Sequence, residues 1–181
     1  FGFLNRLLVA PLSSRFSIVM ASAIFITTLS LIQTTAIVIM SALLGAGLPS
    51  PVGLALVALI VLLLVVAVTA LSLGLAFALP GHIELLAVTF VTNLPLLFAS
   101  TALVPLSFMP KWLQVVATLN PLSYAIEPIR YLYLHPDWSF SSVILQAPFG
   151  DVTLGADLLI LVGLCAIALV SVQPLMKRRL A

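Results

Sequence analysis

Long apolar runs separated by short polar breaks dominate the sequence. Four runs reach the roughly 20 residues that a helix needs to cross about 30 Å of hydrocarbon. They cover approximately residues 17–44, 52–79, 85–106 and 154–172. Apolar residues are continuous within each run rather than alternating, which favours helices over the strands of a barrel. The pattern predicts an all-α fold, a polytopic transmembrane helix bundle with four spans.

The breaks between the runs predict the topology. Residues 45–51 and 80–84 are short turns rich in Gly and Pro, so the first three spans should be antiparallel neighbours. Only the third connection, residues 107–153, is long. Because no internal repeat or low-complexity linker interrupts the pattern, residues 1–181 are expected to form a single transmembrane domain.

Composition excludes a water-soluble domain. Hydrophobic residues make up 63% of the 181 residues, and the mean hydropathy is +1.34. A net charge of +2 gives no support for nucleic-acid binding. Arg6 and Arg15 precede the first span, while Lys177, Arg178 and Arg179 follow the last. The positive-inside rule therefore predicts that both ends are cytoplasmic and that the third connection is external.

The segment MPKWLQVVATLNPLSYAIEPIRYLYL, before the last span, is amphipathic and broken by prolines. A helix that can begin at Pro110 should end at Asn120 and Pro121. A second helix follows and carries Glu127 and Arg130 three residues apart, where they can pair on one face. Two arrangements fit this pattern: an interfacial helix lying flat, or a re-entrant hairpin that caps an external cavity.

Hydroxyl residues follow one narrow face of the first span. Thr27, Ser30, Thr34 and Ser41 recur at helical spacing. Such side chains bond across helices or to their own backbone, but they can also line a wet transport path. Both interpretations remain open on sequence alone.

Other features concern helix packing. Ala70, Gly74 and Ala78 repeat a small residue at every fourth position of the second span, which lets another helix approach closely. Pro95 should bend the third span, as a structural kink or a gating hinge. Cys165 lies in an apolar run and is expected to be a core residue.

The sequence offers little for catalysis or metal binding. His82, Glu84 and His135 fall in predicted loops at spacings unlike those of metal ligands. No nucleophile elbow, zinc-protease motif or phosphate-binding loop is present. We expect neither an enzyme nor a cofactor bound by this chain.

Two segments resemble the membrane subunit of bacterial type-2 ABC exporters, permeases that move drugs, lipids or polysaccharide outward. GFLNRLLVAP, at residues 2–11, is similar to the family's cytoplasmic segment before its third span. LVPLSFMPKWLQVVATLNPLSYAIEPIR, at residues 103–130, resembles its external signature. The likeness implies that the four spans are the last four of six, and the start at Phe1 rather than Met fits a fragment. Phe3 departs from the family, which commonly has Thr there.

The resemblance also implies partners and residue roles. The chain would be half of a homo- or heterodimeric permease in the bacterial plasma (inner) membrane, and ATP with Mg²⁺ would bind a separate ABC ATPase subunit. Residues 1–16 would contain the coupling helix, with docking by Leu4, Arg6, Leu7, Leu8 and Pro11. Residues 109–134 would be re-entrant helices forming an external gate with Trp112, Asn120, Pro121, Tyr124, Glu127 and Arg130. The transport path would include Thr27, Ser30 and Thr34.

Other functional classes remain as alternatives. An ion-coupled secondary transporter usually needs ionisable residues within its spans, and here Asp157 lies near the end of one. A membrane assembly or scaffold protein would need only spans that pack. The first segment can likewise be a plain membrane-surface helix rather than a docking helix.

Overall fold

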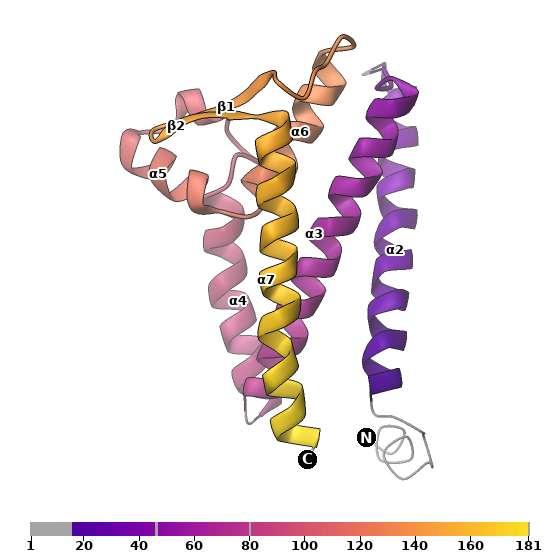
Figure 1. Ribbon diagram of the computed structural model, residues 1–181, viewed down its shortest axis with the longest axis vertical. Helices are drawn as coiled ribbons and strands as arrows, with labels where there is room; N and C mark the ends of the chain where they lie inside the picture. Colours follow the sequence, from indigo (N-terminus) through magenta and orange to yellow (C-terminus); the bar gives the residue numbers. More distant parts are fainter. Residues whose placement is uncertain (1–15, 46, 80, 181) are drawn as a thin grey trace.

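A computed structural model describes residues 16–45, 47–79 and 81–180 of the chain. The long helices α2 (Phe16–Leu43), α3 (Pro51–Ala78) and α7 (Leu154–Leu180) run along the long axis beside the shorter α4 (His82–Phe98) (Figure 1). The connection from α4 to α7 contains η1 (Leu106–Phe108), α5 (Lys111–Leu119), α6 (Ser123–Leu134), β1 (Val143–Ala147) and β2 (Gly150–Thr153). The fold is that of an all-α polytopic membrane protein, as predicted.

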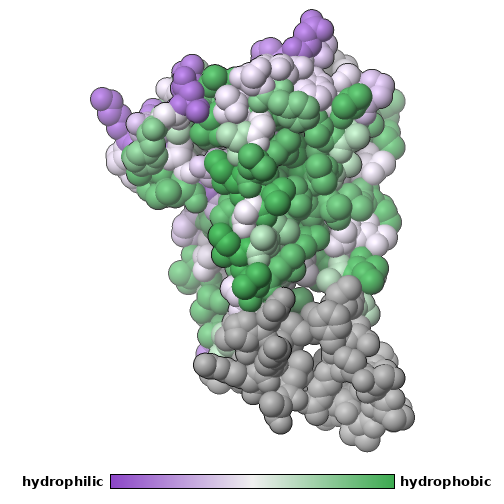
Figure 2. Space-filling model, viewed as in Figure 1, coloured by the Kyte–Doolittle hydropathy of each residue, from purple (hydrophilic) through white to green (hydrophobic). Residues whose placement is uncertain are grey.

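Three of the described helices are long and apolar enough to cross a membrane. Their candidate spans are Ala23–Leu43, Pro51–Ala76 and Leu154–Val172, close to the first, second and fourth predicted spans. Apolar side chains cover the visible sides of the bundle, whereas hydrophilic ones gather at the end that carries β1, β2 and α5 (Figure 2). This distribution is the one expected of a bundle whose sides face lipid.

Helix α4 is shorter than its predicted range of 85–106, which was wrong at both ends. The helix begins at His82, so His82 and Glu84 lie exposed in its first turn rather than in a loop. It ends at Phe98, and 17 residues span about 25 Å at 1.5 Å per residue. Further along, Pro105 has no N–H to bond the Thr101 carbonyl, so a regular helix could not have continued through residue 105.

The connection before α7 contains a β-hairpin that the sequence analysis did not predict. Strands β1 and β2 pair antiparallel with a register irregularity between Val143 and Leu145. Nearby, the Trp138 Nε1–H donates to Ser50 Oγ at 3.1 Å, and the same oxygen accepts the Gly53 N–H at 3.1 Å. The α2–α3 turn and the long connection therefore meet at one end of the bundle.

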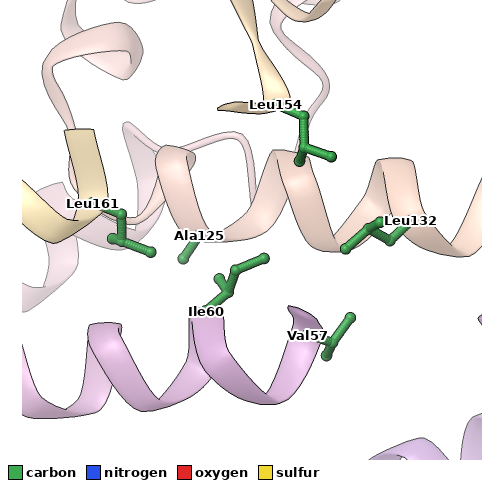
Figure 3. Close-up of a cluster of buried hydrophobic side chains, with 6 residues drawn as sticks. All are labelled: Val57, Ile60, Ala125, Leu132, Leu154 and Leu161. Atoms are coloured by element: carbon green, nitrogen blue, oxygen red, sulfur yellow. The ribbon is translucent and has the colours of Figure 1, made fainter. Parts of the chain in front are cut away.

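Helix α6 shares the main core with α3 and α7. Buried side chains from all three helices form one apolar cluster (Figure 3), consisting of Val57, Ile60, Ala125, Leu132, Leu154 and Leu161. The helix that carries Glu127 and Arg130 is thus part of the bundle and not a surface appendage.

A second cluster joins α3 to α7 through small residues. It contains Ala67 and Ala70 of α3 with Cys165, Ala168 and Val172 of α7. Small side chains let the two backbones approach closely, so dispersion contacts are dense. Burial of Ala70 and Gly74 confirms the predicted packing face, although Ala78 is exposed, and the prediction that Cys165 is a core residue is also confirmed.

Truncating the α3–α6–α7 core should destabilise the bundle. The Leu161 side chain is 1% exposed and Leu159, on the same helix, is 74% exposed. Leu161→Ala should lower the free energy of unfolding by about 2–5 kcal/mol, because it leaves a cavity. Leu159→Ala is the matched control and should change it by less than about 0.5 kcal/mol. Equilibrium unfolding in mixed micelles measures both, and equal losses would contradict the packing described.

Candidate functional site

Side chains from the α5–α6 segment satisfy the backbone carbonyls at the end of α4. Asn120 Nδ2 donates to the Leu96 carbonyl at 2.6 Å and to the Ala99 carbonyl at 2.9 Å. Its Oδ1 accepts the Leu122 N–H at 3.0 Å, within the break between α5 and α6. Asn120 is 5% exposed, so without it these groups would be buried and unpaired. The Asn120 side-chain amide thus pairs with backbone groups at the end of α4 and in the break that follows α5.

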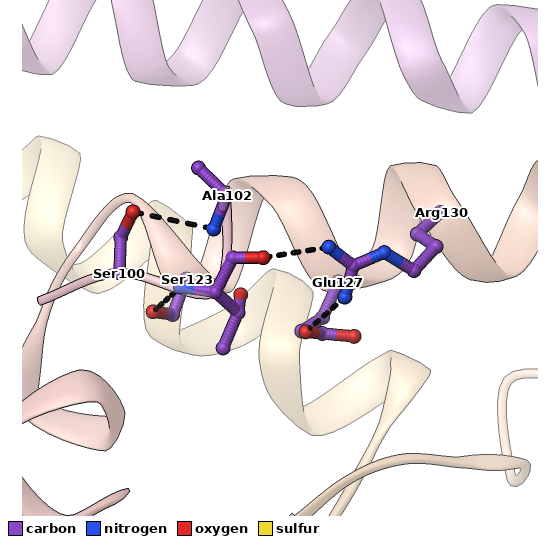
Figure 4. A network of polar contacts seen from close by, with 6 residues as sticks. Ser100, Ala102, Ser123, Glu127 and Arg130 are labelled. Carbon is purple, nitrogen blue, oxygen red and sulfur yellow. Dashed lines mark hydrogen bonds and ion pairs between the residues drawn. The ribbon is translucent and has the colours of Figure 1, made fainter. Parts of the chain in front are cut away.

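Arg130 satisfies another backbone carbonyl just beyond the end of α4. Its Nη2 donates to the Thr101 carbonyl at 2.6 Å, the carbonyl that Pro105 cannot reach with an N–H. Its Nη1 donates to Glu127 Oε1 at 2.7 Å, and Ser123 Oγ accepts the Thr101 N–H at 3.2 Å (Figure 4). Glu127 is only 8% exposed, and the guanidinium compensates its charge.

We refer to these contacts together as the α4–α6 junction. It comprises the backbone of residues 96–101 with the side chains of Asn120, Ser123, Glu127 and Arg130. The junction fixes α6 to α4 through groups more than 20 residues apart in sequence. It is therefore a tertiary contact between distant segments and not a local helix cap.

Tyr124 stabilises the break between α5 and α6. Its hydroxyl donates to the Thr118 carbonyl at 2.6 Å, near the end of α5. Burial raises the pKa of the Tyr124 hydroxyl above its ordinary value, and the negative charge of Asp157 adds to this effect. The hydroxyl therefore stays protonated and remains a donor throughout the physiological pH range.

Most of the predicted gate residues meet at this place. Asn120, Glu127 and Arg130 belong to the α4–α6 junction, and Pro121 and Tyr124 lie at the adjoining break. The predicted Glu127–Arg130 pair is confirmed. Trp112 is different: it is 68% exposed on α5 and makes none of the hydrogen bonds of the junction. That these residues act as a gate stays a prediction.

The predicted path residues make no hydrogen bond to another helix among the described residues. Thr27, Ser30 and Thr34 are half-buried on α2, and no hydrogen bond joins them to another helix among the described residues. Neighbouring Thr28 and Thr35 donate to carbonyls of their own helix. The predicted docking residues Leu4, Arg6, Leu7, Leu8 and Pro11 lie outside the described residues.

The sequence analysis missed two polar residues of this region and did not predict the burial of a third. Ser123 and Thr101 take part in the α4–α6 junction, and nothing in their local pattern indicates it. Asp157 is fully buried in the first turn of α7, and its carboxylate has no hydrogen-bond partner among the described residues. The sequence analysis named Asp157 in the ion-coupled alternative, because an ionisable residue inside an apolar span is a functional candidate by default, but it did not predict this burial. Across the described chain, no group of three His, Cys, Asp or Glu could hold a metal ion.

Comparison with known proteins identifies similar sequences. The family model described as ABC-2 type transporter matches residues 1–134. A protein of Porphyra purpurea named putative transport permease ycf38 is 55% identical over 180 residues, which cover 99% of this chain and 62% of that protein. The protein of the same name from Cyanophora paradoxa is 54% identical over 162 residues, covering 90% of this chain and 56% of its own length.

The chain thus spans about three fifths of the length of the curated relatives it matches. A third relative, from Pyropia yezoensis, carries the same name and is 51% identical over 180 residues, 99% of this chain and 62% of its own length. No solved structure matches the chain.

Replacing the amide of Asn120 should loosen the α4–α6 junction. Asn120→Asp keeps an acceptor for the Leu122 N–H but removes both donors and places a charge against two carbonyls. We expect a loss of about 1–3 kcal/mol of stability per unpaired buried group and faster hydrogen exchange at the amides of residues 99–102. Gln146→Glu, the same chemical change at an exposed position, is the control. Unchanged exchange in Asn120→Asp would show that the junction does not hold α4.

Proposed function

The chain belongs to the ABC-2 type transporter family, and on that premise we propose that it is the membrane part of an ATP-driven exporter. It forms one half of the path for an amphiphilic substrate: a lipid-like molecule, a drug or a polysaccharide. The chain is a transport subunit and not an enzyme. ATP and Mg²⁺ bind and react on a separate ABC ATPase subunit, and this chain binds no cofactor.

The observation that carries the proposal is the α4–α6 junction. Irregular backbone at membrane depth is tolerated only where it is buried in protein or lines a cavity. At the end of α4, Asn120 and Arg130 satisfy the irregular backbone within the protein. This supports a re-entrant α5–α6 hairpin that closes the external end of the path, with the junction as its latch.

Exposed apolar faces support a dimer with the path between two bundles. Helix α4 buries none of its residues, and Phe90, Val91 and Phe98 are among its large exposed side chains. The candidate span of α2 is likewise unburied. A second copy or a related permease would cover part of these faces, and lipid would cover the rest. The hydroxyl stripe of Thr27, Ser30 and Thr34 would then border the path.

Orientation follows from the charges. The beginning of α2 and the end of α7 lie at one end of the bundle, opposite α5, α6, β1 and β2 (Figure 1). We assign the former end to the cytoplasmic side of a bacterial plasma membrane, because Arg15 and the cluster at residues 177–179 adjoin it. Residues 1–16 would then meet the ATPase.

A second function is favoured by one observation, the buried Asp157. A carboxylate without hydrogen bonds inside a span is typical of ion- or proton-coupled transport. In that case, transport would respond to an imposed proton gradient and to Asp157→Asn, and it would not require ATP.

Reconstitution of the full-length protein with its co-purifying ATPase distinguishes the two functions. We expect outward movement of a fluorescent phospholipid analogue to require ATP and to stop when the phosphate-binding lysine of the ATPase is replaced. Dissipating the proton gradient should leave the initial rate unchanged. Transport that survives loss of ATPase activity but stops with the gradient would reject the exporter and favour the alternative.

A further inference from the structure

A cavity of about 390 Å³ opens beside the α4–α6 junction. It is lined by residues 105–107 around η1, by Gln114 of α5, by Glu127 of α6 and by residues 143–146 of β1. Strand β1 pairs with β2 on one edge, and the cavity lies along β1. The volume suits a small organic molecule.

Glu127 is the one charged residue in the lining of this cavity. Its Oε1 accepts from Arg130 Nη1 at 2.7 Å. Arg130 does not line the cavity, although its guanidinium remains paired with the Glu127 carboxylate.

The surroundings strengthen the negative character of this end of the chain. From α5 to β2 there are three carboxylates, Glu127, Asp137 and Asp151, and two cationic side chains, Lys111 and Arg130, a net charge of −1. Gln114 Nε2 donates to the Met109 carbonyl at 2.8 Å, which leaves its amide oxygen free to accept. Such an environment attracts a cation that donates hydrogen bonds.

The remaining lining mixes apolar residues with neutral polar ones, and Ser107, Gln114 and Gln146 are its polar members. Pro105, Leu106, Val143, Ile144 and Leu145 supply hydrocarbon surface around the one carboxylate. An alkylammonium group fits this mixture, because its ammonium can donate to the carboxylate and to neighbouring neutral oxygens while its alkyl chain lies against the hydrocarbon surface.

We propose that this cavity is a binding site for an alkylammonium group, with Glu127 as its anionic partner. The proposal goes beyond the proposed function, since it assigns a ligand class to an external cavity whether or not ATP drives transport. Two sources share this chemistry: a free organic amine, and the ethanolamine headgroup of a phospholipid.

Binding of dansylcadaverine, a fluorescent primary amine, tests the site without ATP. The full-length protein is placed in phosphatidylglycerol nanodiscs, and probe emission is titrated against empty nanodiscs. We expect saturable binding that N-acetyl-dansylcadaverine, the uncharged analogue, does not show. Equal binding of both probes would overturn the proposal, whereas loss of ATP-driven transport alone would not affect it.

Substitutions test whether the probe binds in this cavity. Glu127→Gln should weaken binding about tenfold or more, because a hydrogen bond to a charged group is lost. If that variant does not fold, Gln146→Lys places a cation on an exposed lining residue and should weaken binding similarly. Asp151→Asn removes a nearby exposed charge that is not in the lining, and it should change the dissociation constant less than about twofold. Equal losses for Gln146→Lys and Asp151→Asn would show surface attraction only, and would overturn the site.

Adding phosphatidylethanolamine to the nanodiscs separates the two sources. An increase in the apparent dissociation constant of the probe supports the site with a lipid headgroup as its occupant. An unchanged constant supports the site with a free organic amine.

Discussion

The structure depends on one constraint: the carbonyl groups at the end of α4 need hydrogen-bond donors in a protein whose surroundings are largely hydrocarbon. In water, an early helix end costs little because solvent pairs with the freed groups. Inside a membrane protein, the donors must come from the chain itself. Asn120 and Arg130 supply them, and in doing so they fix where α6 lies. The position of the hairpin follows from this requirement as much as from apolar packing.

Because α6 also contributes to the main core, the α4–α6 junction is coupled to the packing of the helix bundle. Ala125 and Leu132 pack against α3 and α7, while Arg130 on the same helix donates to the Thr101 carbonyl just after α4. A displacement of α6 that opened the external end would therefore disturb contacts with both long helices. This linkage offers a physical route between the far end of α7 and the position of the hairpin.

Much of the fold could be predicted from the sequence, because unbroken apolar runs and Gly/Pro turns specify membrane helices. The two helices of the hairpin and the Glu127–Arg130 pair were likewise predicted, since Pro110, Pro121 and a three-residue spacing act locally. The end of α4 was not predicted, because apolar residues continue past Phe98. The groups that cap α4 lie more than 20 residues away in the sequence. The strands were missed because each has only four or five residues. Burial of Asp157 is a tertiary property that no local pattern reveals.

The hydroxyl of Ser50 has a wider consequence than its size suggests. It accepts from the first turn of α3 and from Trp138, which lies 88 residues further along the chain. This single hydroxyl oxygen thus connects the loop after α2 to the segment before β1. The α2–α3 loop and the segment before β1 therefore cannot separate without losing a hydrogen bond that also involves the first turn of α3.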